Sequence, residues 1–241
     1  MPKNSYIRIL LLFGMALVIT LTGCVDTSVN PIPSTIDYRS NIKVVNFAEG
    51  VSSADFNMTT PDGTTIALGT IAFGNEDHAG SAFMDIPAGS KTLTFNSESY
   101  RFSTEVDKKI RVFIVGSTVD KRDIVKFSQR YIFQTSDDPS NSSIYRQDSA
   151  AVAFINGSSD AVIDQIDAVA SSGTTTISSA SLEQGDMVSY TYLKAGQYTF
   201  NFMSGDSTIS SLQTTVASQK RYTAAVYGTS SSLQNKVFTD D

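Results

Sequence analysis

The chain has 241 residues, of which 18 are basic and 24 acidic, and its formal net charge is −6. Nucleic-acid-binding proteins usually present basic patches to phosphates, and the basic clusters Lys108-Lys109-Ile110-Arg111 and Lys121-Arg122 are interpreted as solvated strand ends or turns, so no nucleic-acid partner is expected. Cys24 is the single cysteine, which excludes an intramolecular disulfide framework and a thiolate metal cluster.

The N-terminus has the pattern of an export signal. Lys3 and Arg8 give a positive start, and Ile9–Leu21 is an apolar run without a charge. A bilayer-spanning helix needs about 20 apolar residues, whereas a run of about 10 to 14 is typical of a signal-peptide core. We therefore predict a signal peptide over residues 1–23, whose removal takes away two bases and no acid.

The end of this run resembles the bacterial lipobox. Leu21, Thr22, Gly23 and Cys24 are an apolar residue, two small residues and the cysteine that becomes the new N-terminus. The resemblance implies a diacylglyceryl thioether on Cys24 and an acyl chain such as palmitate on its amine, and two or three chains anchor a protein stably in a membrane. Val25 is not an acidic retention signal, so we expect an outer-membrane lipoprotein that faces the periplasm or the cell surface. An ordinary signal peptide and an uncleaved anchor are the alternatives.

Two polar segments divide the remaining chain. Residues 24–40 contain Pro31 and Pro33 and predict a flexible tether, and residues 135–147 contain turn-forming residues and predict a linker. The segments between and after them are rich in Val, Ile, Thr, Tyr and Phe, which favour strands. They predict one β-sandwich module at residues 41–134 and another at residues 148–241.

The two predicted modules resemble each other, which indicates duplication. Three pairs of landmarks recur at offsets of 110, 107 and 112 residues: Asn46 with Asn156, Gly89 with Gly196, and Gly116 with Gly228. The Met187–Tyr192 segment alternates as a half-buried strand does, with Val188, Tyr190 and Tyr192 on the apolar face. Gly89 and Gly196 lie between two such runs and are predicted to close hairpins. The predicted fold class is all-β, with two tandem immunoglobulin-like or transthyretin-like β-sandwich domains.

The first copy carries a series of short motifs in a fixed order. They are Val44-Val45-Asn46, Asp55, Asp62-Gly63, Ile86-Pro87-Ala88-Gly89 and Ile114-Val115-Gly116. This series resembles the bacterial domain of unknown function family 4397 (DUF4397), over about 90 residues in each copy. The second copy departs more from it, with Lys194 in place of the proline. The resemblance implies a secreted or lipid-anchored protein with tandem β-sandwich modules, and it implies no activity.

Patterns that carry catalytic or metal chemistry are scarce. His78 is the single histidine and lies in a loop-like segment, so it is assigned no role and no histidine metal cluster is expected. Glycine motifs that bind phosphates or dinucleotides are absent from the sequence. Asp160, Asp164 and Asp167 lie close together without the EF-hand spacing, which favours solvated turns over a calcium site. We predict no catalytic, metal or cofactor site.

The sequence thus predicts a non-catalytic, lipid-anchored envelope protein. Its modules would bind a protein or glycan in an adhesion-like role, or act as a spacer. Tyr190, Tyr192 and Tyr198 would stack on sugars if they faced outward, although residues at strand spacing are more often core. The alternative is a hydrolase of envelope polysaccharide, which needs two carboxylates about 5 to 9.5 Å apart across a cleft.

Overall fold

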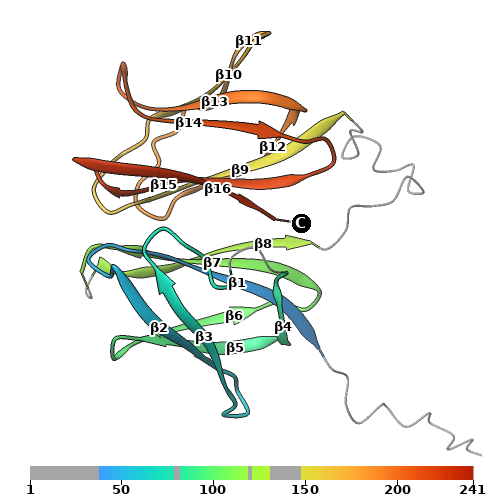
Figure 1. Ribbon diagram of the computed structural model, residues 1–241, viewed down its shortest axis with the longest axis vertical. Helices are drawn as coiled ribbons and strands as arrows, with labels where there is room; N and C mark the ends of the chain where they lie inside the picture. Colours follow the sequence, from blue (N-terminus) through green and yellow to red (C-terminus); the bar gives the residue numbers. More distant parts are fainter. Residues whose placement is uncertain (1–37, 79–81, 119–120, 131–147, 241) are drawn as a thin grey trace, which may run out of the picture. The chain divides into compact units, whose positions relative to one another are not determined.

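The computed structural model describes residues 38–78, 82–118, 121–130 and 148–240, which form an all-β structure (Figure 1). The predicted signal peptide with its lipobox and Cys24, and the predicted linker at residues 135–147, lie outside the described residues. The first strand begins at Arg39 and so includes the last two residues of the predicted tether. No helix within the described part of the chain has the length and apolar character needed to span a membrane.

Residues 38–130, here called module 1, contain eight strands in two sheets. The strands are β1 (Arg39–Ala48), β2 (Ser53–Thr59), β3 (Thr65–Ala72), β4 (Met84–Pro87), β5 (Gly89–Phe95), β6 (Glu98–Thr104), β7 (Lys108–Gly116) and β8 (Asp123–Arg130). One sheet has the order β4-β1-β7-β8 and the other β3-β2-β5-β6. The two sheets form two facing layers in Figure 1. β1 and β7 pair in parallel, whereas the other pairs are antiparallel.

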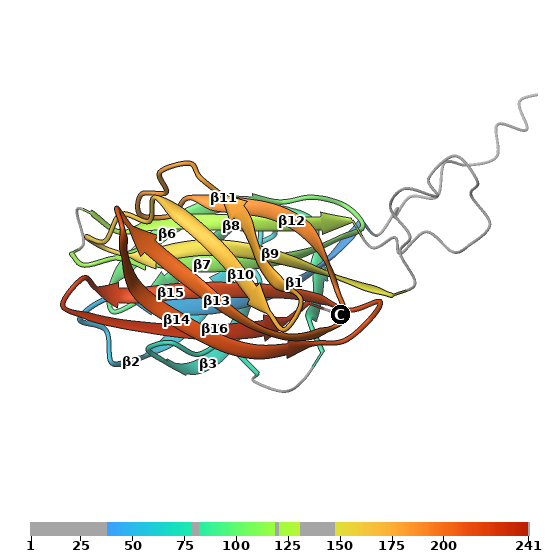
Figure 2. The same ribbon diagram turned by 90° about the horizontal axis from the view of Figure 1, so that it is seen from above.

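Residues 148–240, here called module 2, repeat this topology strand for strand. The strands are β9 (Ser149–Ser158), β10 (Gln165–Ala170), β11 (Gly173–Ser178), β12 (Met187–Lys194), β13 (Gly196–Ser204), β14 (Ser207–Val216), β15 (Arg221–Thr229) and β16 (Ser232–Thr239). The sheets are β12-β9-β15-β16 and β11-β10-β13-β14, and β9 pairs in parallel with β15. In Figure 2, β10 and β13 of one sheet lie over β9 and β15 of the other. The chain therefore folds into two β-sandwiches of the same topology.

Each sandwich has its own hydrophobic core because its strands alternate between buried and exposed residues. In β2, Ala54, Phe56 and Met58 are buried, while Ser53 and Asp55 between and beside them are exposed. The core of module 2 is built in the same way around three phenylalanines: Phe154, Phe200 and Phe202.

The predicted pair Asn46 and Asn156 has one structural role in both modules. The Asn46 amide nitrogen donates hydrogen bonds to the carbonyl oxygens of Val51 and Ile71, and its oxygen accepts one from the Ala48 amide. Asn156 makes the equivalent three bonds at 2.8 to 3.0 Å. Both side chains are fully buried, so each asparagine satisfies backbone groups that would otherwise lack partners. The agreement confirms the predicted alignment of the two copies at this position.

Gly89 and Gly196 do not close hairpins, and that prediction is wrong. Gly89 follows β4, which pairs with β1 in one sheet, and it begins β5, which pairs with β2 and β6 in the other. Gly196 stands in the same place between β12 and β13. The chain at these glycines passes from one sheet to the facing sheet, and the φ of 106° at Gly89 belongs to this corner.

Candidate functional site

Modules 1 and 2 contact each other through one sheet of each, β4-β1-β7-β8 and β12-β9-β15-β16, here called the junction sheets. A third hydrophobic core lies between these sheets, formed by Val45, Phe47, Phe113 and Val115 of module 1 and Ile155, Ala225, Tyr227 and Phe238 of module 2. The Phe47 ring stacks on Tyr227 with 4.4 Å between centroids. A Cβ at Gly157 would lie 2.6 Å from the Phe47 ring, so glycine is what lets the two modules approach this closely.

Alternate residues of the junction strands face different cores. Val44 and Val112 belong to the core of module 1, whereas the next residues along these strands, Val45 and Phe113, belong to the core between the modules. Strands that are buried on both faces have nearly continuous apolar sequences, and Val112–Val115 is such a run. Two-sided burial therefore explains why these segments do not alternate as β2 does.

The three tyrosines that would stack on sugars lie in three different surroundings, and the predicted single apolar face of Met187–Tyr192 is wrong because a β-bulge interrupts β12. The register of β12 against β9 shifts between Val188 and Thr191, so Tyr190 does not share the core-facing side of Val188. Tyr190 instead contacts the ring of Phe127 in module 1, with 5.0 Å between centroids. Tyr192 is 38 % exposed. Tyr198 packs against the core of module 2 and stacks on Phe200.

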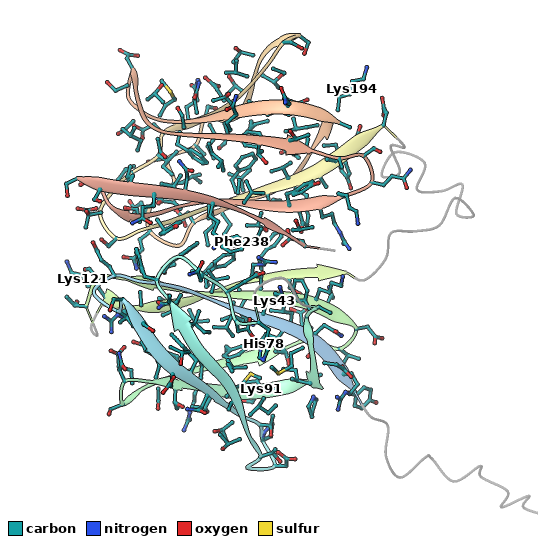
Figure 3. The ribbon with its side chains drawn as sticks, in the orientation of Figure 1. Lys43, His78, Lys91, Lys121, Lys194 and Phe238 are labelled. Carbon is teal, nitrogen blue, oxygen red and sulfur yellow. The ribbon has the colours of Figure 1, made fainter. Side chains whose placement is uncertain are left out.

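Arg111 is the centre of a buried ion cluster between the junction sheets. Its guanidinium lies 2.8 Å from a Glu76 carboxylate oxygen and 3.2 Å from Asp240 Oδ1, and it donates a hydrogen bond to the Thr239 carbonyl oxygen. The second oxygen of Glu76 lies 2.7 Å from Lys43 Nζ. Arg111 also lies against the Phe238 ring at 4.7 Å. Figure 3 shows Lys43 on β1 and Phe238 on β16.

Asp240 is the module 2 anion of this cluster. Its Oδ2 accepts hydrogen bonds from the Tyr190 hydroxyl at 2.9 Å and from the Thr223 hydroxyl at 2.7 Å. Burial raises the pKa of Asp240 above its ordinary value, although the Arg111 charge and the two hydroxyl donors oppose this shift. Burial also raises the pKa of Tyr190, as does the neighbouring Asp240 charge. Arg111 is thus the main charge that favours the ionised form of this buried carboxylate, and the Arg221 charge adds to its effect.

The prediction that Arg111 and Arg122 are solvated is wrong. Arg111 is fully buried at the junction, and the Arg122 side chain is 7 % exposed, where it pairs with Glu98 and donates a hydrogen bond to the Glu49 carbonyl oxygen. The burial of Arg111 within β7 has no local signal in the sequence, because part of the surface that covers it comes from the other module.

Asp77 and His78 lie next to the ion cluster in sequence. Asp77 is buried and accepts a hydrogen bond from the Val44 amide at 2.8 Å, and burial raises its pKa. The His78 side chain is 48 % exposed and its Nδ1 lies 3.6 Å from Asp77 Oδ2. Asp77 thus has a structural role, because its carboxylate binds the backbone of β1 at Val44. The contact between Asp77 and His78 gives His78 no nucleophile to activate.

The three aspartates considered for calcium bind different local groups. Asp160 accepts hydrogen bonds from the Ser230 amide and hydroxyl, and Asp164 accepts one from the Gly205 amide. Asp167 accepts hydrogen bonds from Gln165 and Thr176 on the face of its own sheet. Within the described ranges, no group of three or more His, Cys, Asp or Glu side chains could hold a metal ion.

The strand β16 carries a row of side chains toward module 1. Lys236 donates hydrogen bonds to the Gly74 carbonyl and the Asn75 side chain, Phe238 lies in the shared core, and Asp240 reaches Arg111. Residues two apart share one face of a strand, so Gln234 and Ser232 continue this row toward the β15–β16 turn.

A pocket of about 330 Å³ lies at the turn end of this row, between the modules. Module 1 contributes Glu49, Gly50, Ser52 and Phe73, and module 2 contributes Gly228, Thr229, Ser232 and Gln234. Glu49 accepts a hydrogen bond from the Ser159 hydroxyl of module 2, and the Phe73 ring meets the Tyr227 ring edge-on at 5.4 Å. The pocket therefore depends on the packing of both modules, which the sequence patterns did not reveal.

Comparison with known proteins relates this chain to a domain of unknown function. The model of the DUF4397 family, described as "Domain of unknown function (DUF4397)", matches residues 150–241. The match falls on the copy that we expected to depart more from the family. A search of functionally characterised proteins gave no match.

Among solved structures, the chain is similar to the Bacillus anthracis TIE protein, with 10 % sequence identity and a TM-score of 0.23. The similarity covers 83 % of this chain and 34 % of that one, so the chain spans about a third of the length of the TIE protein. The family match and the sandwich observed over the same residues agree. Module 2 is a DUF4397-like domain.

Proposed function

We propose that this protein is a lipid-anchored envelope protein whose two sandwiches act as one rigid, non-catalytic binding or spacer unit. The observation that carries the proposal is the core shared between the junction sheets, with Phe47 stacked on Tyr227 and the Arg111–Asp240 ion pair beside it. A spacer or a presenting module needs fixed geometry, and apolar packing with buried ion pairs supplies it. The unit would hold its ligand, a protein or a glycan, at a distance from the membrane that the tether sets.

The anchor in this proposal rests on the lipobox-like sequence that ends at Cys24. Its test is membrane fractionation and intact mass, with Cys24→Ala compared against Thr27→Ala in the predicted tether. We expect the wild type and Thr27→Ala to carry the acyl chains and to sediment with the outer membrane. Cys24→Ala should lose the lipid mass. Retention of Cys24→Ala in the membrane with unchanged mass would contradict the anchor.

The hydrolase alternative receives less support from the pocket between the modules. Glu49 is the one carboxylate among its lining residues, whereas the usual glycosidase chemistry needs two. Incubating the protein with envelope polysaccharide and measuring new reducing ends tests this difference. Sustained release of reducing ends that Glu49→Gln abolishes would favour the hydrolase over the binding module.

A further inference from the structure

We infer that the pocket between the modules, lined by Glu49, Ser52, Phe73, Ser232 and Gln234, binds one neutral pyranose residue of a glycan. This inference rests on the proposed function, because it names the ligand class and the place where a binding module would hold it. Its basis is the combination of an aromatic ring with several uncommitted polar groups in one pocket.

The polar groups of the pocket are available to a ligand. Among the residues that the structure describes, none hydrogen-bonds to the side chains of Ser52, Ser232 or Gln234, although each lines the pocket and is exposed. One carboxylate oxygen of Glu49 is held by Ser159, which fixes its orientation. Hydroxyl, amide and carboxylate groups are the partners that sugar hydroxyls need.

Phe73 supplies the apolar surface of the pocket. It follows β3 directly, its amide donates a hydrogen bond to the Ser52 carbonyl oxygen at 2.9 Å, and its ring is supported by Tyr227. The electron-rich face of an aromatic ring attracts the polarised C–H groups on the flat side of a pyranose. Contacts from both modules therefore order this ring in the wall of the pocket.

Size and charge narrow the ligand class. A volume of about 330 Å³ lies at the lower end of the range for ligand pockets, which suits one sugar ring rather than a run of sugars. Glu49 is the charged group among the lining residues, so an acidic sugar would meet a like charge. Gly50 and Gly228 are also among the lining residues and add no side chain to the pocket.

The test is ligand-observed NMR and glycan-array binding of the full chain in detergent. The probes are methyl glycosides of neutral hexoses and N-acetylhexosamines, with methyl glucuronide as the acidic comparison. We expect at least one neutral glycoside to bind and the glucuronide to bind more weakly. Gln234→Ala should weaken binding about threefold to tenfold, and Phe73→Leu should weaken it about tenfold. Gln213→Ala, on the exposed face of β14 in the other sheet of module 2, should leave it unchanged.

Three outcomes would overturn the inference. Either no neutral glycoside binds, or the affinity is the same in the wild type, Gln234→Ala and Phe73→Leu, or only peptides bind and the pocket variants weaken their binding. The Gln234 side chain makes no hydrogen bond to the described residues, so Gln234→Ala should fold. Thermal melting shows whether Phe73→Leu is folded. Failure here leaves the anchor unaffected, because membrane fractionation of Cys24→Ala is measured separately.

Discussion

Replacing Arg111 by methionine measures how much the buried ion cluster contributes to the free energy of unfolding. The variant keeps a long unbranched side chain but removes the cation that faces Asp240 and Glu76. Glu76 would still pair with Lys43, whereas Asp240 would keep the hydroxyl donors of Tyr190 and Thr223 and the weaker field of the Arg221 charge. The main cost is therefore a buried carboxylate that has lost its ion-pair partner.

The size of this cost follows from two limits. Removing one partner of a buried ion pair costs about 3 to 5 kcal/mol. Protonating the stranded carboxylate at pH 7 costs at most about 4 kcal/mol, given an ordinary Asp pKa of about 3.9 and 1.36 kcal/mol per unit. We expect Arg111→Met to lower the free energy of unfolding by about 3 kcal/mol. That corresponds to a melting temperature lower by about 6 to 12 °C in a chain of this size.

The pH dependence gives this prediction its sign. Burial raises the pKa of Asp240 in the folded state, so its contribution to stability is present at low pH and is lost as pH rises through the folded pKa. Arg111 opposes the shift, so Arg111→Met should raise the pKa of Asp240 further. The deficit of the variant should therefore be larger at pH 7 than at pH 4.

Urea unfolding of the wild type, Arg111→Met and the double variant Arg111→Met/Asp240→Asn, each at pH 4 and 7, measures these effects. The double variant removes both charges and should recover to within about 1.5 kcal/mol of the wild type, because paired charges can be replaced together at little cost. A deficit below about 1 kcal/mol at pH 7, or a double variant no better than the single one, would refute the reasoning.

Three further predictions concern other parts of the fold. Asn46→Ala and Asn156→Ala should each lower the free energy of unfolding by about 2 to 4 kcal/mol, because three buried backbone groups lose partners; a loss in only one module would contradict their equivalence. Phe47→Ala should cost about 3 to 5 kcal/mol and split one calorimetric transition into two, whereas the control Phe56→Leu should keep one. Burial raises the pKa of Asp77, so its ionisation costs stability as pH rises; Asp77→Asn should gain stability relative to the wild type from pH 4 to pH 8 in urea unfolding, and a gain independent of pH would contradict this.

The fold class was predictable because strand periodicity and duplicated landmarks are local signals. Asn46 and Asn156 recur at an offset of 110 residues, and both prove to be buried amides with the same three hydrogen bonds. The corner at Gly89 was harder to predict from the sequence, because a glycine between two strands fits a hairpin and a change of sheet equally well. Sheet membership depends on pairing with β1 and β2, which are distant in sequence.

The junction between the modules was missed for a physical reason. On β16, Leu233 and Val237 face the core of module 2, while Gln234 and Lys236 lie on the other face, which Asp240 continues just after the strand. Polar residues at an interface between modules look like surface residues in the sequence. The signal that could have identified the junction is the unbroken apolar run Val112–Val115, which a sheet with one solvated face would not need.

Paired and solitary modules should differ in the residues of the junction sheet. The family match covers residues 150–241, the length of one module, yet the junction sheet of that module exposes Ile155, Ala225 and Tyr227 if module 1 is removed. An exposed apolar patch of this kind favours association between domains. A related module that works alone should therefore carry polar residues at these three positions, whereas one that pairs should keep them apolar. Alternation along β9 and β15 is thus a criterion, readable from sequence, for whether a domain like module 2 packs against a second β-sandwich.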